Sequence, residues 1–427
     1  MANAQAISQN QTGSAAQSKG WTKRDTEWCL TLFGTAVGAG VLFLPINAGL
    51  GGIWPLIFMT LLIGPMTFLA HRGLSRFCLS ASNPNADITD AVAEHFGPKA
   101  GSLITFGYFA AIFPILLIYG IGITNTVSSL LVNQMGWEAA PNRALLSFVL
   151  VAGLVGVMVC GQKMVLKVTS AIVYPLIAVL VGLSLYLVPQ WNVAAQFSVA
   201  PDAVSFIKTL FLTIPVLVFA FNHSPAVSSF SAAYRKDLGD NAEAQASKTL
   251  KRAAMMLVGF TMFFVYSCVL TLSPAELMAA KQANISILSY FAERTDNAMF
   301  GWLAQIVAIV AITSSFFGHY MGTREGLTGL ISKQFEGSGK KLNQKALDRG
   351  IMIFITLAVW LVAYLDVSVM GMIESIVSPI IAAILFIMPV YAVKRIPSMK
   401  KYESKANIFT LIMGIIAITG FIASQLL

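Results

Sequence analysis

Charged residues are scarce in this chain, and their scarcity excludes most soluble folds. Only 11% of the 427 residues are Asp, Glu, Lys or Arg, while 56% are hydrophobic. An ordinary soluble protein carries about 25% charged residues. So few charges would not coat the two or three soluble domains that this length allows, so we expect a single integral membrane domain.

The chain is also poor in the side chains that build metal and redox centres. The four cysteines form no CxxC pair and show no metal-ligand spacing, so we expect small buried side chains at Cys29, Cys78, Cys160 and Cys268. The four histidines fall in separate segments, which argues against an intramembrane enzyme: His71, His95, His223 and His319.

The first twenty residues, MANAQAISQNQTGSAAQSKG, contain no apolar stretch. A cleavable signal peptide needs an apolar stretch of about 7–15 residues. We therefore expect residues 1–20 to be a disordered cytoplasmic tail, followed by one membrane domain over residues 21–427.

Long apolar runs fill the rest of the sequence. A helix needs about 20 residues to cross the hydrocarbon core of a bilayer, and the alternating strands of a β-barrel do not occur in this sequence. We predict an all-α integral membrane protein with eleven transmembrane helices, at approximately residues 27–50, 52–70, 101–133, 143–161, 165–188, 206–232, 253–273, 297–322, 350–365, 367–393 and 407–426.

Lysine and arginine are distributed unevenly between the predicted loops. The insertion machinery keeps basic residues in the cytoplasm, and a cytoplasmic N-terminus leaves 24 of the 28 basic residues there. The C-terminus is then periplasmic, and only four basic residues fall outside: Arg143, Lys208, Lys281 and Arg294. The net charge of +9 is therefore expected to reflect topology and contact with anionic lipid. Nucleic-acid binding would require a clustered basic face, which the sequence does not show, so we do not expect it.

The first apolar run, FGTAVGAGVLFLPINAG at residues 33–49, contains residues that weaken a helix. Gly34, Gly38, Gly40 and Pro45 favour unwinding near mid-membrane, where the freed backbone groups must face protein or a watery cavity. The alternative is a close helix–helix contact, because Gly34 and Gly38 form a GxxxG pair.

The sixth apolar run carries a second interruption. Asn222, His223, Ser224 and Pro225 lie within TIPVLVFAFNHSPAVSSF, residues 213–230. Proline removes a backbone hydrogen bond, and three consecutive polar side chains at this depth are costly unless they bind something. Two interrupted helices at corresponding positions indicate a transporter built from inverted repeats. We predict a 5+5 arrangement, with repeats at about 27–188 and 206–393 and an extra helix at about 407–426.

Three segments resemble the hydroxy/aromatic amino acid permeases of the amino acid–polyamine–cation superfamily, and most of all the serine/threonine branch. They are GTAVGAGVLFLPINAGLGG in the first span, FAFNHSP in the sixth and SSFFGHYMGTREG in the eighth. The resemblance covers nearly the whole chain after the first twenty residues. It implies the bundle also found in sodium-coupled neurotransmitter transporters, no cofactor, and a substrate site between helices 1 and 6.

The resemblance also implies which residues bind the amino acid. The carboxylate is expected at backbone N–H groups that begin the second half of helix 1, since unpaired amides and the helix dipole favour an anion. The ammonium is expected at carbonyls where the first half-helices end, and polar side chains of helix 6 are candidates to recognise a hydroxyl. The candidates are Gly38, Ala39 and Gly40 for the carboxylate; Thr35, Ala36 and Phe219 to Asn222 for the ammonium; and Asn222, His223 and Ser224 for the hydroxyl. Tyr119 is a further candidate to bond the carboxylate, or else a core or interfacial tyrosine.

The coupling ion is predicted to be H⁺ or Na⁺. The superfamily's cation site corresponds here to the carbonyls of Gly34 and Val37 with the hydroxyls of Thr313, Ser314 or Ser315. Serine/threonine permeases usually carry a lysine, suited to proton coupling, where this chain has Ser314. The alternative is that these hydroxyls only bond to carbonyls of their own helix. We favour a proton, with sodium as the second choice.

Further ionisable residues lie inside the apolar runs. Glu374 is an intramembrane carboxylate and so a functional candidate, either as a gate or in proton transfer; a structural partner or a place in the outer vestibule is the alternative. His319 and Glu325 lie toward the cytoplasmic end of the eighth run, where we expect a gate or a solvated terminus. His223 is either a proton carrier or a neutral hydrogen-bonding residue. The external segment 274–296 is predicted to form helices that lie over the mouth as a lid.

The predicted function is symport of a small hydroxy amino acid, L-serine first and L-threonine second, across a bacterial cytoplasmic (inner) membrane by alternating access. No bond is made or broken, so we do not expect an enzyme. The expected partners are the amino acid and the lipid bilayer, without nucleic acid or an obligate protein partner. The alternatives are a permease for an aromatic or other neutral amino acid, and a sensor that binds an amino acid without moving it. A channel would need a continuous polar pore, which the sequence does not suggest.

Overall fold

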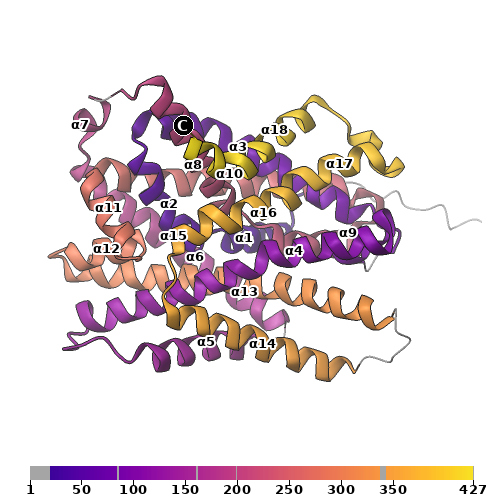
Figure 1. Ribbon diagram of the computed structural model, residues 1–427, viewed down its shortest axis with the longest axis horizontal. Helices are drawn as coiled ribbons and strands as arrows, with labels where there is room; N and C mark the ends of the chain where they lie inside the picture. The colour runs from indigo at the N-terminus through magenta and orange to yellow at the C-terminus, as the bar shows by residue number, and fades with distance from the viewer. Residues whose placement is uncertain (1–19, 84–85, 160–161, 199, 337–342, 427) are drawn as a thin grey trace, which may run out of the picture.

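The computed structural model describes residues 20–426 except 84–85, 160–161, 199 and 337–342. Within these ranges the chain is helical and contains no β-strand, as predicted. The predicted tail, residues 1–20, lies outside the described residues except for Gly20. Most of the long helices run side by side along the longest axis of the molecule, and the short helices α7, α11 and α12 gather at one end (Figure 1).

The apolar runs form helices whose ends differ from the predicted ones. In chain order the α-helices are α1 (Lys23–Ala36), α2 (Ala39–Leu50), α3 (Ile53–Leu79), α4 (Ile88–Ser129), α5 (Arg143–Val159), α6 (Gln162–Leu187), α7 (Val193–Phe197), α8 (Ala203–Ala220), α9 (Ser224–Leu238), α10 (Ala242–Thr271), α11 (Pro274–Gln282), α12 (Ile287–Arg294), α13 (Ala298–Glu336), α14 (Gln344–Leu365), α15 (Val369–Met372), α16 (Ser378–Ala382), α17 (Met388–Arg395) and α18 (Lys405–Leu426). Two π-helical segments, η4 (Ile373–Val377) and η5 (Ala383–Ile387), join α15, α16 and α17 into one span.

The helices are those of a multi-pass membrane protein. Among the described residues, eight helices are long and apolar enough to cross a membrane, and the bent pair α1–α2 makes a ninth. One of the eight, Ser224–Thr271, runs through both α9 and α10. Two further apolar helices, Arg143–Val159 and Lys405–Gly420, are shorter. The all-helical membrane architecture is therefore confirmed, while the number of eleven spans stays a prediction.

Polar residues fix where several helices begin. Thr22 and Asp25 form a capping box at the start of α1: Asp25 N–H donates to Thr22 Oγ1 (3.3 Å) and Thr22 N–H donates to Asp25 Oδ2 (2.8 Å). Asp87 and Asp90 form a capping box in the same way at the start of α4. Such boxes satisfy N–H groups that have no acceptor within the helix. Helix α2 begins without any side-chain cap.

The interruption predicted in the first span is present but narrower than expected. α1 ends at Ala36 and α2 begins at Ala39, with a bend of 53° between them. Pro45 takes no part in the break, because it lies inside α2. The expectation that unwinding would involve this proline was therefore wrong, and the break is confined to Val37 and Gly38.

The interruption predicted in the sixth span is also present. α8 ends at Ala220 and α9 begins at Ser224. Pro225 lies in the first turn of α9, where a missing N–H is tolerated because that group has no helical acceptor. The proline therefore begins the second half-helix instead of breaking a continuous one.

One predicted loop boundary was wrong and another was nearly right. The helical run α4 begins at Ile88, but Gly97 has non-helical backbone angles (φ 77°, ψ 173°) and divides the run into two helices, so the second begins close to the predicted start at residue 101. α13 continues to Glu336, well past the predicted end at residue 322. In the described part of the chain, α4 (42 residues, bent at Gly97) and α13 (39 residues) are the longest α-helical runs.

The segment 274–296, which the sequence predicts to be external, forms two short helices, α11 and α12. The Ser273 backbone N–H and hydroxyl donate to Glu276 Oε2 (2.9 and 2.7 Å) at the start of α11. These hydrogen bonds hold the pKa of Glu276 below its ordinary value. Asn284, with a left-handed φ of 55°, joins the two helices.

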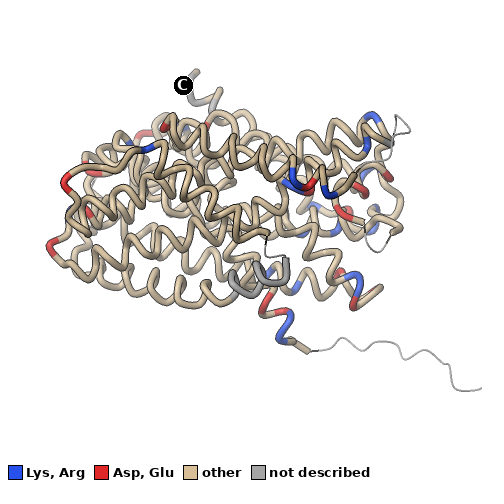
Figure 2. Tube along the Cα trace, turned by 90° about the horizontal axis from the view of Figure 1, so that it is seen from below, with Lys and Arg blue, Asp and Glu red and all other residues tan. Residues whose placement is uncertain are grey.

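Charged residues lie toward the two ends of the bundle and leave its middle almost uncharged (Figure 2). Most of the Lys and Arg residues gather toward one end, and the opposite end carries mainly Asp and Glu. Among the cysteines, Cys29, Cys78 and Cys268 are buried and free, as predicted. Cys160 lies outside the described residues.

Candidate functional site

The break in the first span leaves backbone donors without helical acceptors. The first hydrogen bond of α2 runs from Leu42 N–H to Gly38 O (3.2 Å). The N–H groups of Gly38, Ala39 and Gly40 precede it, and no side chain caps them. A buried helix N-terminus with unpaired N–H groups suits an anion. These are the residues predicted to bind a carboxylate.

Helix α13 packs against this break through small residues. A Cβ on Gly38 would overlap the Ser315 side chain and would lie 3.1 Å from the Tyr119 hydroxyl. A Cβ on Gly318 would lie 2.7 Å from Thr35 Oγ1. Because glycine has no Cβ, the two backbones approach closely, and the Tyr119 hydroxyl lies beside Gly38.

The same face of α13 continues to the second interrupted span. Gly322 follows Gly318 by four residues and so lies one turn further along this face. A Cβ on Gly322 would lie 2.9 Å from Pro225 Cβ in the first turn of α9. One stripe of small residues on α13 therefore contacts both interrupted spans.

A chain of hydrogen bonds joins Tyr119, Ser315 and Thr35. Ser315 Oγ donates to Thr35 O (2.5 Å) and lies 2.6 Å from the Tyr119 hydroxyl oxygen. Because Ser315 uses its proton on the carbonyl, Tyr119 is the donor in the second bond. Thr35 O, predicted to meet the substrate ammonium, thus has one partner and a second lone pair still available.

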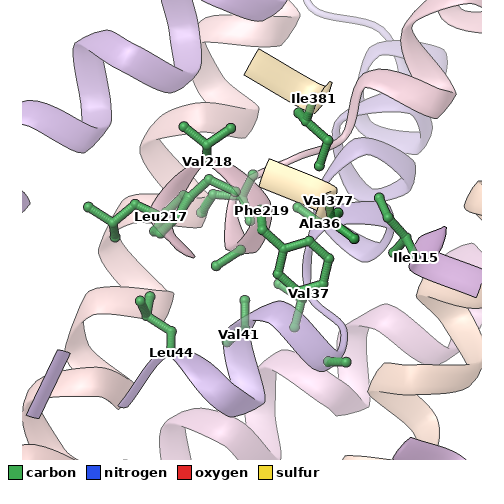
Figure 3. Close-up of a cluster of buried hydrophobic side chains, with 14 of the residues drawn as sticks. Ala36, Val37, Val41, Leu44, Ile115, Leu217, Val218, Phe219, Val377 and Ile381 are labelled. Atoms are coloured by element: carbon green, nitrogen blue, oxygen red, sulfur yellow. The ribbon is translucent and has the colours of Figure 1, made fainter. Parts of the chain in front are cut away.

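The two breaks lie against each other. A Cβ on Gly40 would lie 2.7 Å from Ala220 Cα and 3.0 Å from the Phe219 ring. The ring is buried and takes up space between the half-helices. Figure 3 shows Phe219 within a cluster of buried apolar side chains whose labelled members are Ala36, Val37, Val41, Leu44, Ile115, Leu217, Val218, Phe219, Val377 and Ile381.

At the second break, side chains satisfy the opened backbone. Asn222 Oδ1 accepts a hydrogen bond from the backbone N–H of Ser224 (3.1 Å) and so satisfies a donor in the first turn of α9. Asn222 is buried, and its Nδ2 has no hydrogen-bond partner. Leaving a buried donor unpaired costs about 1–3 kcal/mol. This amide is therefore a donor available to a ligand.

His71 of α3 also contacts the second break, although the sequence assigned it no role there. Its Nδ1 lies 2.8 Å from Thr67 O, and its Nε2 accepts the backbone N–H of His223 (3.1 Å). The rings of His71 and His223 are stacked, with centroids 3.5 Å apart and 9° between their planes. The two residues are 152 positions apart, so no sequence motif contains both. The one feature of the sequence that could have indicated a role for His71 is a histidine inside an apolar helix.

His319 lies beside Ser315 and Tyr119 in the interior and not at a solvated helix end. It is 1% exposed, and its Nδ1 donates to Ser315 O (2.9 Å). Its ring packs edge-on against the Tyr119 ring, with centroids 5.2 Å apart. The expectation of a solvated terminus here was wrong, because α13 continues beyond this point.

Glu325 lies two turns further along α13 and joins three helices. Its carboxylate accepts the hydroxyl of Ser228 on α9 (2.7 Å). Ser228 Oγ in turn accepts the backbone N–H of Ile88 at the start of α4 (3.0 Å). This contact ties the second half of the sixth span to the third and eighth spans.

The oxygens predicted to bind a cation are partly brought together. Ser314 Oγ lies 3.4 Å from Gly34 O, and it lies 3.0 Å from a carbonyl of its own helix, as the alternative reading expects. Val37 is fully buried and Thr313 is partly exposed. Neutral carbonyl and hydroxyl oxygens are ligands for a hard cation. In the part of the chain that the structure describes, no group of three His, Cys, Asp or Glu side chains could hold a metal ion.

Glu374 lies away from both breaks. Its Oε1 accepts Asn47 Nδ2 (2.9 Å) and lies 3.5 Å from Lys281 Nζ. Asn47 belongs to α2 and Lys281 to α11, so the contact joins segment 274–296 to the second half of the bent pair α1–α2. The carboxylate therefore has partners on two other helices, and its role as a gate stays a prediction.

A polar cluster centred on Asp366 also holds segment 274–296. Asp366 Oδ1 accepts hydrogen bonds from Arg143 (2.8 Å), Asn125 (3.1 Å) and Asn284 (3.1 Å). These donors come from α5, α4 and the connection between α11 and α12. One carboxylate oxygen thus ties three segments to the start of the tenth span.

The sequence model of the tryptophan/tyrosine permease family matches residues 28–424, a range that contains both breaks and the residues of the candidate site. The chain belongs to this family. The permease is 51% identical over 410 residues to the serine transporter SdaC of Escherichia coli strain K12, and 50% identical over 410 residues to that of Shigella flexneri; each match covers 95% of both chains. It is thus a member of the amino acid–polyamine–cation superfamily. Its relatives in Escherichia coli and Shigella flexneri are transporters and not enzymes.

The permease also resembles a solved structure, that of MhsT in complex with L-phenylalanine. The TM-score is 0.64, and the match covers 96% of this chain and 99% of MhsT at 16% sequence identity. At that identity the likeness shows the fold alone, which is LeuT-like, as the resemblance in sequence implied.

Proposed function

We propose that this permease is a secondary symporter that imports L-serine, and with lower preference L-threonine, by alternating access. The observation that carries the proposal is the 51% identity, over 95% of both chains, to a protein named as a serine transporter. The paired interruptions of the first and sixth spans support the transport mechanism, because they offer opposed half-helix ends at one site.

The proposed topology has eleven spans. The bent pair α1–α2 is the first and α8–α9 the sixth, α10 is the seventh, and the shorter helices α5 and α18 are the fourth and eleventh. Spans one to five and six to ten are two inverted repeats, over about 27–188 and 206–393. The basic end of the bundle is cytoplasmic, which places the N-terminus inside and the C-terminus in the periplasm of a bacterial inner membrane.

The proposed site binds each end of the amino acid with a different half-helix. The carboxylate accepts hydrogen bonds from the N–H groups of Gly38, Ala39 and Gly40. It accepts a further one from Tyr119, whose single O–H then turns from Ser315 to the ligand. The ammonium donates to carbonyls that end α1 and α8: Thr35, Ala36 and Phe219. These contacts recognise any α-amino acid and so do not select serine by themselves.

Selection for a small hydroxy side chain is assigned to the second break. Asn222 Nδ2 is buried without a partner, and it donates to the serine hydroxyl in our proposal, with His223 and Ser224 beside it. A site that pairs a substrate hydroxyl rejects analogues without one, because a buried polar group is then left unpaired. The Phe219 ring limits the space to a compact side chain.

Transport is coupled to a cation gradient, H⁺ before Na⁺. Na⁺ would be held by the carbonyls of Gly34 and Val37 with Thr313, Ser314 or Ser315. Opening to the outside would release Glu374 from Lys281, and opening to the inside would release Glu325 from Ser228. One helix bundle rocks against the other between these two states.

A permease for aromatic amino acids is the second candidate. Two observations favour it: the matching family is named for tryptophan and tyrosine, and MhsT, which shares the fold, was solved with L-phenylalanine. In this reading the glycines of the first break leave room for a ring.

Uptake into proteoliposomes under separately imposed H⁺ and Na⁺ gradients tests the proposal. We expect saturable accumulation of labelled L-serine, inhibited by unlabelled serine more than by threonine, and at least about tenfold less by tryptophan or tyrosine. Better competition by the aromatic amino acids would favour the second candidate. Saturable binding without accumulation would instead indicate a sensor.

The variant Ser314→Lys tests the candidate cation site in the same assay. If Na⁺ drives uptake, we expect the ammonium of the introduced lysine to replace the cation and to remove sodium dependence. Sodium dependence that survives intact would show that the site has been assigned to the wrong residues. Lys208→Arg, on the first turns of α8, is the matched control.

A further inference from the structure

The stacked imidazoles of His71 and His223 have a defined arrangement of protons. Thr67 O can only accept a hydrogen bond, so His71 Nδ1 carries the proton; the backbone N–H of His223 can only donate, so His71 Nε2 is unprotonated. Phe221 O, 3.1 Å from His223 Nδ1, places the proton of the second ring on Nδ1 as well. Both rings are therefore neutral, with the same tautomer.

One nitrogen of this pair lacks a partner. His223 Nε2 is buried and makes no hydrogen bond, whereas His71 Nε2 is occupied by a backbone N–H. The His223 side chain is 0% exposed. A buried acceptor without a donor is unfavourable, so this lone pair is available to a ligand that donates.

Charged groups on the helices packed around the pair are engaged elsewhere. Arg72 lies over the Phe68 ring and Arg76 pairs with Glu243 (2.7 Å). Glu325 is held by Ser228 on α9. On α1, α8, α17 and α18 the charged residues lie near the helix ends, and on α10 they extend no further along than Arg252. Those on α9 lie in its last turns at Arg235, Lys236 and Asp237. His319, the other titratable group at this depth on α13, bonds within its own helix.

We propose that His223 Nε2 is the proton-binding site of the symport and that His71 is the residue that positions it. The inference rests on the proposed serine symport and names its coupling ion. A proton from water on the side of higher proton activity adds to the Nε2 lone pair, giving an imidazolium, and returns to water on the other side. His71 itself cannot take a proton at Nε2 without losing its hydrogen bond to the break.

The arrangement stabilises the imidazolium and couples it to the substrate. The neutral His71 ring lies parallel to the His223 ring and offers its π face to the cation. His223 directly follows Asn222 in the break, so the positive charge forms in the segment proposed to meet the substrate. In a medium of low polarity an imidazolium and a carboxylate attract strongly, and each then raises the affinity for the other.

The direct test measures protons taken up when L-serine is added to the purified full-length permease in weak buffer with a pH-indicating dye. The wild type should take up protons with serine. His223→Gln, which cannot titrate, should lose this uptake and should lose at least about tenfold of the accumulation driven by a proton gradient. His95→Gln is the matched control, because His95 bonds Ser80 outside the site, and it should behave as the wild type.

His71 is tested by two variants with opposite hydrogen-bonding ability. His71→Gln still offers an acceptor to the His223 N–H, so serine uptake should persist, but its pH midpoint should move to lower pH by about 0.5 units or more since the stacked ring is gone. His71→Leu offers no acceptor and should lose uptake at least about tenfold. A purely structural role would reduce uptake without moving the midpoint.

Three results would overturn the inference. They are undiminished proton uptake by His223→Gln, an unmoved pH midpoint in His71→Gln, and wild-type accumulation driven by Na⁺ alone. If His223→Gln fails to fold, the two His71 variants decide. The last of the three results would leave the proposed serine symport standing, whereas a wild type that accumulates no serine under any gradient would overturn that proposal itself.

Discussion

The two interrupted spans are opened by opposite means. At the first break a missing side chain allows close approach: a Cβ on Gly38 would overlap Ser315. At the second break, polar side chains take over the backbone's hydrogen bonds, with His71 accepting from His223 N–H and Asn222 accepting from Ser224 N–H. The first break is defined by space and the second by hydrogen bonding.

This difference divides the work of binding between the breaks. The N–H groups of the first break remain available, which suits a feature that every amino acid shares. The N–H groups at the second break are already taken, so what it offers are side-chain atoms, Asn222 Nδ2 and His223 Nε2. Those atoms suit features that differ between ligands, such as a hydroxyl or a proton.

The largest effect should come from adding volume to the first break. Gly38→Ala places a Cβ in overlap with the Ser315 side chain. Because small displacements at a binding site cost about 100-fold in rate, we expect serine uptake to fall by about that factor. Gly153→Ala, where a Cβ meets nothing within 4 Å, is the control and should leave uptake unchanged. Wild-type kinetics in Gly38→Ala would mean that space does not define this break.

A smaller effect should come from removing the free amide of the second break. In Asn222→Ala the serine hydroxyl loses its proposed donor, so discrimination of serine over alanine, measured as a ratio of kcat/KM, should fall about tenfold. Asn407→Ala removes an amide that donates to Tyr402 O outside the site and serves as the control. An unchanged ratio would move hydroxyl recognition away from Asn222.

The smallest effect should come from the hydroxyl that bridges toward the first break. Tyr119→Phe removes one donor near Gly38, worth about 1 kcal/mol, so KM for serine should rise about fivefold. Tyr266→Phe removes a comparable hydroxyl contact with Thr60 (2.9 Å) and controls for loss of packing stability. A KM equal to that of the wild type would assign Tyr119 to the core alone.

The fold followed from the sequence because its causes are local or compositional. Apolar runs long enough to span a bilayer, with few charges, predict membrane helices directly, and the glycines around residue 38 predicted the first break. Pro45 was assigned to that break wrongly, because proline is also tolerated within a helix that lies against neighbouring helices. The extension of α13 to Glu336 was missed, because a polar helix end resembles a loop in composition.

The candidate site was predictable only in part, since many of its contacts join residues far apart in the chain. The polar run at Asn222 marked the second break by itself. The stacking of His71 on His223 has no counterpart in local sequence, and neither has the bond between Ser315 and Thr35, 280 positions apart. Such contacts depend on how α3 and α13 pack, which no single segment specifies.

The small-residue face of α13 has a consequence for motion. Gly318 and Gly322 have no side chains to interlock where they meet Thr35 and Pro225, so we expect the neighbouring helices to slide past each other readily there. The hydrogen bond from the Ser315 hydroxyl to Thr35 O then holds the two helices together at this surface. We therefore expect the turnover rate of the carrier to depend on how often this hydrogen bond opens, together with the release of Glu374 and Glu325.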